Sequence, residues 1–329
     1  MKNEAYTAHL QEKYADKPDD LAAHVKALAD FHAFLTENGV ESEQSITRED
    51  AVRYVVQRRE HDKDISETIG MLTDYAYFIR NMALISELVL LRDASHVMDR
   101  TSALIKEHAA EAWARIFGGV HIPEVGATLD EMSDFTRETE KRMFAAMPRA
   151  DIERVLSKNA HGWEPEWHWD EHARLVEAGT LDKYLEAHHE GFIQELEGYR
   201  DRNEIFFTSE IDDAVIAFAR EHLKPVRVGN KIVHIRAPYL MKQYLEAEDR
   251  DMKRYYACHC PWKRNAILQK EGALSHAWCY CCLGHAKKSF DFAFEQDIPG
   301  KVIQTMMDED CVLCTYEYEI PEDIMAEFA

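Results

Sequence analysis

Apolar residues recur every three or four positions along residues 19–94, and this spacing predicts a series of amphipathic helices. Asn38 and Gly39 follow the first apolar stripe and are typical of a helix end, because glycine readily adopts the left-handed backbone found there. Thr47 and Asp50, three positions apart, predict an N-cap pair that opens the next helix. This part of the chain is therefore expected to be helical throughout.

Helical spacing continues to residue 117 and is then broken by the glycines and proline of residues 118–123. We place a domain boundary there, which gives a helical module at 1–117 and a second domain at 118–329. Within the second domain, residues 128–157 and 180–223 again carry the helical period.

After Pro225 the apolar pattern changes to the alternation that is typical of strands. Residues 226–228 and 231–236, separated by Gly229 and Asn230, predict a β-hairpin. Further strands are expected at 255–259, 278–281, 302–306 and 314–320, and helices at 238–248, 263–270 and 283–294. The predicted fold class is α+β: an all-helical N-terminal module, then an antiparallel sheet with helices in a cysteine-rich domain.

The composition is that of a globular protein, with 46% hydrophobic and 30% charged residues. A formal net charge of −22 argues against nucleic acid and anionic membranes as partners, since both require a basic surface. No apolar run approaches the roughly 18–20 residues of a membrane span, and the polar start lacks the apolar core of a signal peptide. We expect a cytoplasmic protein without a membrane partner, and the sequence leaves a homo-oligomer open.

All seven cysteines lie in the C-terminal part of the chain, and four of them form two Cys-x-Cys pairs, Cys258 with Cys260 and Cys279 with Cys281. If both pairs lie on strands, the two-residue period points each pair of sulfurs to one face. Pairing those strands would gather four thiols, and the 311–314 segment would supply another. The expected metal ligands are Cys258, Cys260, Cys279, Cys281 and Cys314.

Four thiolates are the ligands of a closed structural zinc site, and an iron–sulfur cluster would use the same set. Zinc is the expected cofactor, ahead of a cluster, and the expected partner is a metal ion or a small molecule. In a reducing cytoplasm, clustered cysteines are more often metal ligands, reactive thiols or small buried residues than disulfides.

Two alternatives to metal binding stay open. The cysteines could be buried and unreactive, as many free cysteines are. One of them could instead be a nucleophile, because nearby lysine, arginine and histidine side chains lower a thiol pKa. The catalytic candidates are Cys258, Cys281 and Cys314, and we expect Trp262 and Arg264 to contact a bound ligand or cofactor.

A second metal motif lies upstream, where His168, Glu171 and His172 match the H-x-x-E-H pattern of inverted zinc proteases. On a helix the two histidines share a face, and Glu246 or Glu248 could supply a third ligand. With 17 histidines in the chain a chance match is common, so the start of a polar surface helix is the favoured interpretation.

Residues 231–321 contain three distinctive stretches, KRYYACHCPWKRNAI, SHAWCYCCLGHAKKSF and CTYEYEIP. They resemble an uncharacterised cysteine-rich bacterial family related to the L-2-amino-thiazoline-4-carboxylate hydrolases and, more distantly, the 4-vinyl-reductase-type domains. The resemblance implies an α+β ligand-binding fold with a site lined by the five cysteines given above. Cys282 and Cys311 depart from the family pattern. The hydrolase relatives open a thiazoline ring by hydrolysis of a C–N bond.

Residues 29–80 carry the stretches ADFHAFLTENGV, SITREDAVRYVVQRR and ISETIGMLTDYAYFIR. Their order resembles the helical core-binding domain of tyrosine recombinases. No recombinase catalytic domain follows, so the resemblance implies a helical interaction module rather than a recombinase.

The sequence thus predicts a cytoplasmic protein that binds a small molecule or metal ion through clustered cysteines, in a regulatory role. The alternative is a thiol- or metal-dependent C–N hydrolase of the L-2-amino-thiazoline-4-carboxylate hydrolase type. The sequence does not decide whether the protein is an enzyme.

Overall fold

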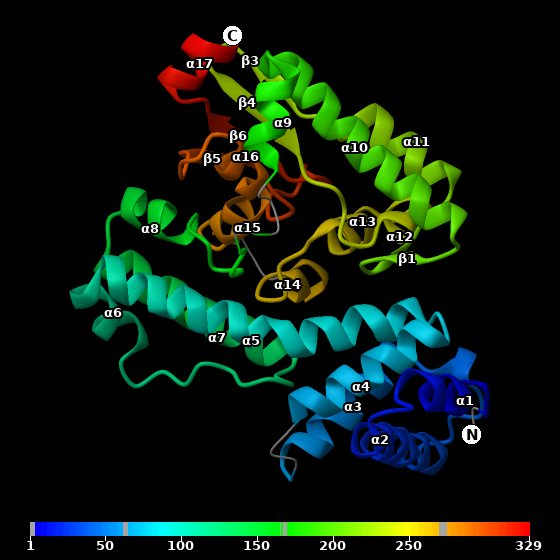
Figure 1. The fold of residues 1–329 in the computed structure, drawn as a ribbon. Coiled ribbons are helices and arrows are strands. Elements are labelled where there is room, and N and C mark those ends of the chain that lie inside the picture. The colour runs from blue at the N-terminus through cyan, green and yellow to red at the C-terminus, as the bar shows by residue number, and fades with distance from the viewer. Residues whose placement is uncertain (1–3, 62–64, 165, 167–169, 270–274) are drawn as a thin grey trace. The chain divides into compact units, whose positions relative to one another are not determined.

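The computed structural model describes residues 4–61, 65–164, 166, 170–269 and 275–329, and Figure 1 labels its elements. The chain forms two compact units: unit 1 contains Met1–His96 with Pro123–Glu131, and unit 2 contains Val97–Ile122 with Met132–Ala329. This division differs from a single boundary after residue 117, because helix α5 (Met82–His108) begins in unit 1 and ends in unit 2. The predicted boundary stays a prediction, and the two units are described separately.

Unit 1 is helical. It contains α1 (Glu4–Lys13), α2 (Pro18–Glu37), a short 3-10 helix (Glu43–Ser45), α3 (Arg48–Arg59), α4 (Ile65–Phe78) and the start of α5. The predicted helix end is confirmed, since Gly39 has a φ of +76° directly after α2 and Asn38. The predicted N-cap pair is also confirmed: the Asp50 amide donates to the Thr47 hydroxyl at 3.2 Å, and the Thr47 amide donates to the Asp50 carboxylate at 2.9 Å.

Unit 2 combines helices with two antiparallel sheets. After the end of α5 its helices are α6 (Ala110–Phe117), α7 (Leu129–Ala146, which begins in unit 1), α8 (Arg149–Leu156), α9 (Glu171–Ala178), α10 (Leu181–Asp201), α11 (Asp213–His222), α12 (Met241–Glu246), α13 (Arg250–Ala257), α14 (Arg264–Gln269), α15 (Cys279–Ala286), α16 (Lys288–Ala293) and α17 (Glu322–Phe328). A small ribbon is formed by β1 (Ile205–Phe206) and β2 (Ser209–Glu210). The larger sheet has the order β3-β4-β6-β5, from β3 (Val226–Val228), β4 (Lys231–Ile235), β5 (Gly300–Gln304) and β6 (Thr315–Glu319).

The fold class is α+β with a helical N-terminal module, as the sequence predicts. The β3–β4 hairpin is confirmed, with Val228 paired to Lys231 across the turn and Gly229 at a φ of +65°. Strands β5 and β6 also form, although β5 begins two residues before the predicted segment at 302–306.

Two predicted strands are wrong, because residues 255–257 end helix α13 and residues 279–281 begin helix α15. The Asp249 side chain caps α13 by accepting from the Met252 amide at 2.9 Å, which starts a helix that then runs on through the apolar residues. Residues 278–281 are all buried, so this short run has no exposed polar face. Its apolar pattern therefore does not distinguish a helix from a strand.

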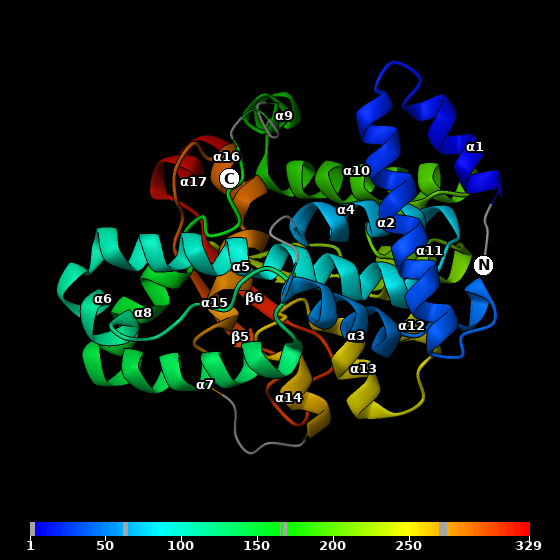
Figure 2. The same cartoon turned by 90° about the horizontal axis from the view of Figure 1, so that it is seen from below.

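Helix α15 is held in the interior of unit 2 by a close backbone approach. A Cβ atom added at Gly284 would lie only 2.5 Å from the carbonyl oxygen of Ser157, so only glycine permits α15 to pack against the end of α8. Strand β5 contacts the same helix, and Figure 2 shows α15 beside β5. The cysteines of α15 are therefore carried on a buried helix.

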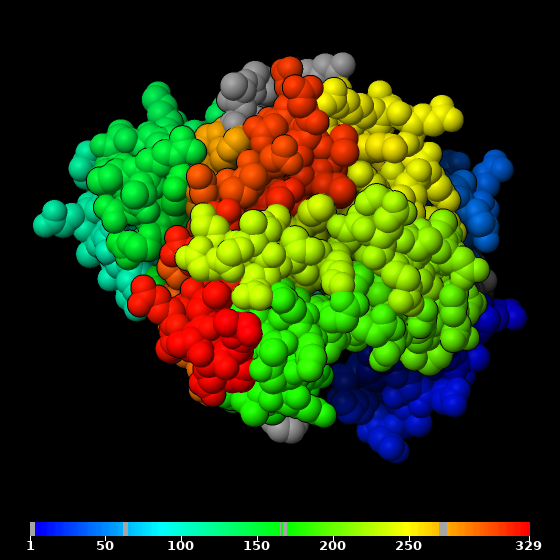
Figure 3. Space-filling model, turned by 90° about the horizontal axis from the view of Figure 1, so that it is seen from above, coloured from blue at the N-terminus to red at the C-terminus, as the bar shows by residue number. Residues whose placement is uncertain are grey.

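The outer edge of the larger sheet is apolar and exposed. Figure 3 shows the β3–β4 hairpin, in yellow-green, crossing the surface of unit 2 between α17 in red and α10 in green. Val226 and Val228 on edge strand β3 are 46% and 59% exposed. None of the described helices combines the length and the apolar character needed to cross a membrane.

Candidate functional site

The cysteines of α15 follow helical geometry rather than the predicted strand geometry. Residues three or four apart share a helix face, whereas residues two apart do not. Cys279 and Cys282 therefore lie on one face of α15, and Cys281 and His285 lie on another. The two faces of this helix carry two different arrangements.

The first arrangement is a buried cavity of about 10 Å³ in unit 2. Three chain segments bring sulfur atoms to it: the end of α13 with the turn that follows, helix α15, and the chain before β6. Met306, Met307 and Tyr316 also line the cavity. The cysteines around it are Cys258, Cys260, Cys279, Cys282 and Cys314.

Four of the five predicted ligand positions therefore meet at one cavity, and one does not. Cys281 does not line the cavity. Cys282, which departs from the pattern of the family that the sequence resembles, lines it instead. Cys311 does not line the cavity, and its thiol donates to the Leu313 carbonyl at 2.6 Å. A helical period applied to residues 279–286 would have selected Cys282, but the sequence offers no signal that favours the helix over the strand.

The two residues expected to contact a ligand lie outside the cavity lining. Trp262 is 3% exposed and its ring lies 5.8 Å from that of Phe135. The Arg264 guanidinium lies over the rings of Tyr255 and Tyr239, at 4.1 and 4.9 Å from their centroids.

Burial raises the pKa of most cavity thiols, so they are held in the protonated form. Burial raises the pKa of Cys258 and Cys279, and it raises the pKa of Cys314 to about 11. The pKa of Cys282 is raised first by its hydrogen bond to Cys260 and then by burial. These four thiols are therefore protonated at neutral pH.

Cys260 is the exception among the cavity cysteines. Its pKa is lowered, first because the Cys282 thiol donates a hydrogen bond to it, an effect that outweighs burial. The backbone amides of Trp262 and Lys263 and the positive charge of Lys263 act in the same direction. Lys263 is itself 3% exposed and pairs with Glu140 at 2.7 Å. Cys260 is thus the cavity cysteine most disposed to be a thiolate.

The second arrangement is a thiol–imidazole pair on the other face of α15. The sulfur of Cys281 lies 3.5 Å from Nε2 of His161, a residue 120 positions away in sequence. The centroids of the His161 and His285 rings lie 4.4 Å apart with the ring planes tilted by 45°, and Nδ1 of His285 accepts a hydrogen bond from Trp163 at 2.5 Å. Burial, then the charges of two arginines, lower the pKa of His161 to about 4. His161 is therefore neutral at pH 7, and the tautomer that carries its proton on Nδ1 accepts at Nε2 from the Cys281 thiol. Burial raises the pKa of Cys281, so this thiol is protonated at pH 7.

The thiols are gathered at the cavity but are not arranged as a finished coordination sphere. Among the residues that the structure describes, no three histidine, cysteine, aspartate or glutamate side chains are placed so as to hold a metal ion as they stand. Binding would require the sulfurs to lose their protons and turn toward a common centre. The residues available for this are the five cavity cysteines.

The Glu171 and His172 side chains of the upstream H-x-x-E-H motif make structural contacts. The first histidine of the motif, His168, lies outside the described residues. Glu171 is 4% exposed and accepts a hydrogen bond from Tyr184 at 2.7 Å, and Nδ1 of His172 donates to the Ala293 carbonyl at 2.8 Å. These contacts fix α9 against α10 and α16.

Comparison of the chain with protein-family models, with curated proteins and with solved structures gives no significant match. The resemblances drawn from the sequence therefore stay predictions.

Proposed function

We propose that this chain is a binding protein whose buried cysteine cavity takes a metal ion, with zinc as the first expectation, and that metal occupancy serves a regulatory role. The observation that carries the proposal is the meeting of five cysteines from three separate segments at one cavity of about 10 Å³. That volume is on the order of one water molecule. Small organic ligands occupy pockets of roughly 300 Å³ or more. The size favours an ion over an organic molecule.

The donor atoms support the same choice. Thiolates are ligands for zinc and for softer metals, and the thioethers of Met306 and Met307 at the cavity wall add soft donors. A bound cation favours the deprotonated thiol, so metal uptake would release the protons that burial holds on Cys258, Cys279 and Cys314. The proposal therefore predicts proton release on loading.

Elemental analysis of protein purified without added metal tests the proposal directly. We expect at least one zinc or similar ion per chain, or its uptake when zinc is titrated into chelator-treated protein, accompanied by proton release in weak buffer. A metal content far below one per chain, together with no uptake and no proton release on titration, would refute it.

The Cys281–His161 pair favours a second candidate function, a thiol-dependent C–N hydrolase. The neutral imidazole of His161 would accept the proton of Cys281 as the sulfur bonds to the carbon of the C–N bond, and would return it to the nitrogen as that bond breaks. Water would then hydrolyse the bond between sulfur and carbon and release the thiol. This mechanism predicts that Cys281 reacts with iodoacetamide faster than a free thiol between about pH 5 and 9, and that His161→Gln removes the advantage. If mass spectrometry finds Cys281 no more reactive than a free thiol, the hydrolase hypothesis is dropped.

A further inference from the structure

Arg264 is a buried arginine whose guanidinium packs against two tyrosine rings and whose Nε–Nη2 edge has no hydrogen-bond partner among the described residues. Its side chain is 1% exposed at the start of α14. The guanidinium carbon lies over the rings of Tyr255 and Tyr239, 4.1 and 4.9 Å from their centroids, a cation–π arrangement. Within the part of the chain that the structure describes, its Nε and Nη2 atoms have no hydrogen-bond partner.

Those two atoms form one edge of the guanidinium. Their N–H bonds run parallel, and this is the fork that binds the two oxygens of a carboxylate side-on. The same edge is occupied on two other arginines of this chain. Nε and Nη2 of Arg227 donate to the two carboxylate oxygens of Asp182, each at 2.9 Å. Nε and Nη2 of Arg254 donate to the Met306 carbonyl at 3.0 and 2.6 Å.

Buried charge gives a second reason to expect an anion at this place. A buried cation is stable when a counter-charge and hydrogen bonds accompany it. No ion pair involving Arg264 occurs among the described residues. Its positive charge instead acts to lower the pKa of the neighbouring Cys258 thiol and His259 imidazole. The unoccupied Nε–Nη2 edge and the positive charge of Arg264 therefore both favour an oxyanion as the binding partner.

We propose that Arg264 anchors a separate binding site for a small oxyanion, a carboxylate held side-on by Nε and Nη2 between Tyr239 and Tyr255. The site is distinct from the cysteine cavity, whose lining does not include Arg264, and the inference does not rest on metal binding. Inorganic phosphate offers the same pair of oxygens, so the two sources are separated by experiment.

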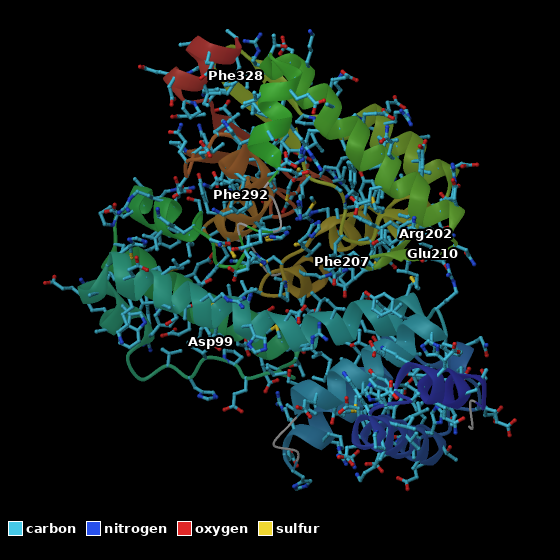
Figure 4. The ribbon with its side chains drawn as sticks, in the orientation of Figure 1. Asp99, Arg202, Phe207, Glu210, Phe292 and Phe328 are labelled. Atoms are coloured by element: carbon cyan, nitrogen blue, oxygen red, sulfur yellow. The ribbon has the colours of Figure 1, made fainter. Side chains whose placement is uncertain are left out.

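The β1–β2 ribbon lies over one side of this site. Phe207, at its turn, is 55% exposed, and its ring meets that of Tyr239 edge-on at 5.8 Å. Figure 4 shows Phe207 between β1 and α14. Its φ of +53° is strained for an aromatic residue, and strained backbone of this kind is found most often at functional sites. The ribbon therefore covers the Tyr239 side of the proposed site.

The test is a titration of the full chain with acetate, propionate or inorganic phosphate, at ionic strength matched with chloride, followed by calorimetry and thermal unfolding. We expect a carboxylate to raise the melting temperature in a concentration-dependent way. Arg264→Lys, which keeps the charge but loses the fork, should weaken the apparent affinity at least tenfold, and Arg264→Gln should abolish the response. Arg227→Gln, which removes a fork already bound to Asp182, is the matched control and should leave it unchanged.

The inference is overturned if none of the three anions stabilises the wild-type chain beyond chloride, or if Arg264→Lys binds the carboxylate as tightly as wild type. A response to phosphate alone overturns the assignment to a carboxylate. If Arg264→Gln does not fold, the Arg264→Lys titration decides. Metal content measured on the same samples keeps this outcome separate from that of the cysteine cavity.

Discussion

Replacing Cys282 by serine should weaken zinc binding far more than replacing Cys281 by serine. The two residues are neighbours on α15, yet only Cys282 lines the cavity, whereas Cys281 faces His161. Serine is close in size to cysteine and keeps the helix, but it is a poor ligand for zinc. The comparison therefore separates the ligand set that the sequence predicts from the set that the structure brings together.

The size of the effect follows from the free energy of a thiolate zinc site. Structural zinc takes four ligands, and we expect Cys282 to be one of the four among the five cavity cysteines, because its thiol hydrogen-bonds Cys260. Structural zinc binds with about 10–16 kcal/mol at pH 7, so one of four ligands accounts for about 2.5–4 kcal/mol. At about 1.4 kcal/mol per factor of ten, Cys282→Ser should reduce the affinity by about 10²- to 10³-fold. Cys281→Ser should change it less than about threefold, because the sulfur of Cys281 lies outside the cavity.

The assay is competition between the protein and a chelating indicator of known zinc affinity, with far-ultraviolet circular dichroism to establish that both variants are folded. Equal losses in the two variants, or a larger loss for Cys281→Ser, would show that the cavity is not the metal site. A Cys311→Ser variant supplies a further control, since Cys311 also lies outside the cavity lining.

Three further predictions concern stability. Asp291→Asn should cost about 1–3 kcal/mol in urea unfolding, because it removes the carboxylate that the 1% exposed ammonium of Lys287 binds at 2.9 and 3.0 Å and leaves Asp297 as the remaining carboxylate partner of Lys287. The carboxyl of Asp297 is partly buried, which would raise its pKa, but hydrogen bonds from Lys158 and Lys287 outweigh burial and lower the pKa to about 2. Its stabilising contribution is therefore complete above about pH 4 and is lost as the pH falls toward 2, so Asp297→Asn should reduce the acid sensitivity of the melting temperature in that window. His161 has a pKa of about 4 when folded and 6.5 as its ordinary value, so the unfolded chain takes up the proton first. Stability should fall as the pH drops from about 6.5 to 4, and His161→Gln should flatten this slope.

Matched variants control each of these measurements. Asp151→Asn removes an exposed carboxylate from an ion pair with Arg154 and should cost less than about 1 kcal/mol. A comparable loss for Asp291→Asn would contradict the role given to the buried lysine. An unchanged acid profile in Asp297→Asn, or an unchanged slope between pH 6.5 and 4 in His161→Gln, would contradict the corresponding pKa argument.

The sequence by itself determined the features whose signals are local. The Thr47–Asp50 cap, the helix end at Gly39 and the β3–β4 turn at Gly229 each depend on a few adjacent residues, and each is present in the structure. The α+β class follows from the change of apolar period after Pro225. Such features form because caps and turns satisfy backbone groups within the segment that carries them.

Only the tertiary structure decided which cysteines meet. Residues 278–281 are buried on all sides, so their pattern fits a strand or a helix, and packing against β5 and the end of α8 selects the helix. That choice rotates Cys282 into the cavity and Cys281 toward His161, across 120 residues of sequence. The unoccupied Nε–Nη2 edge of Arg264 likewise depends on tertiary structure: two tyrosine rings pack against the guanidinium, and no described residue accepts a hydrogen bond from that edge. Contacts of this kind depend on segments far apart in the chain, and no local periodicity encodes them.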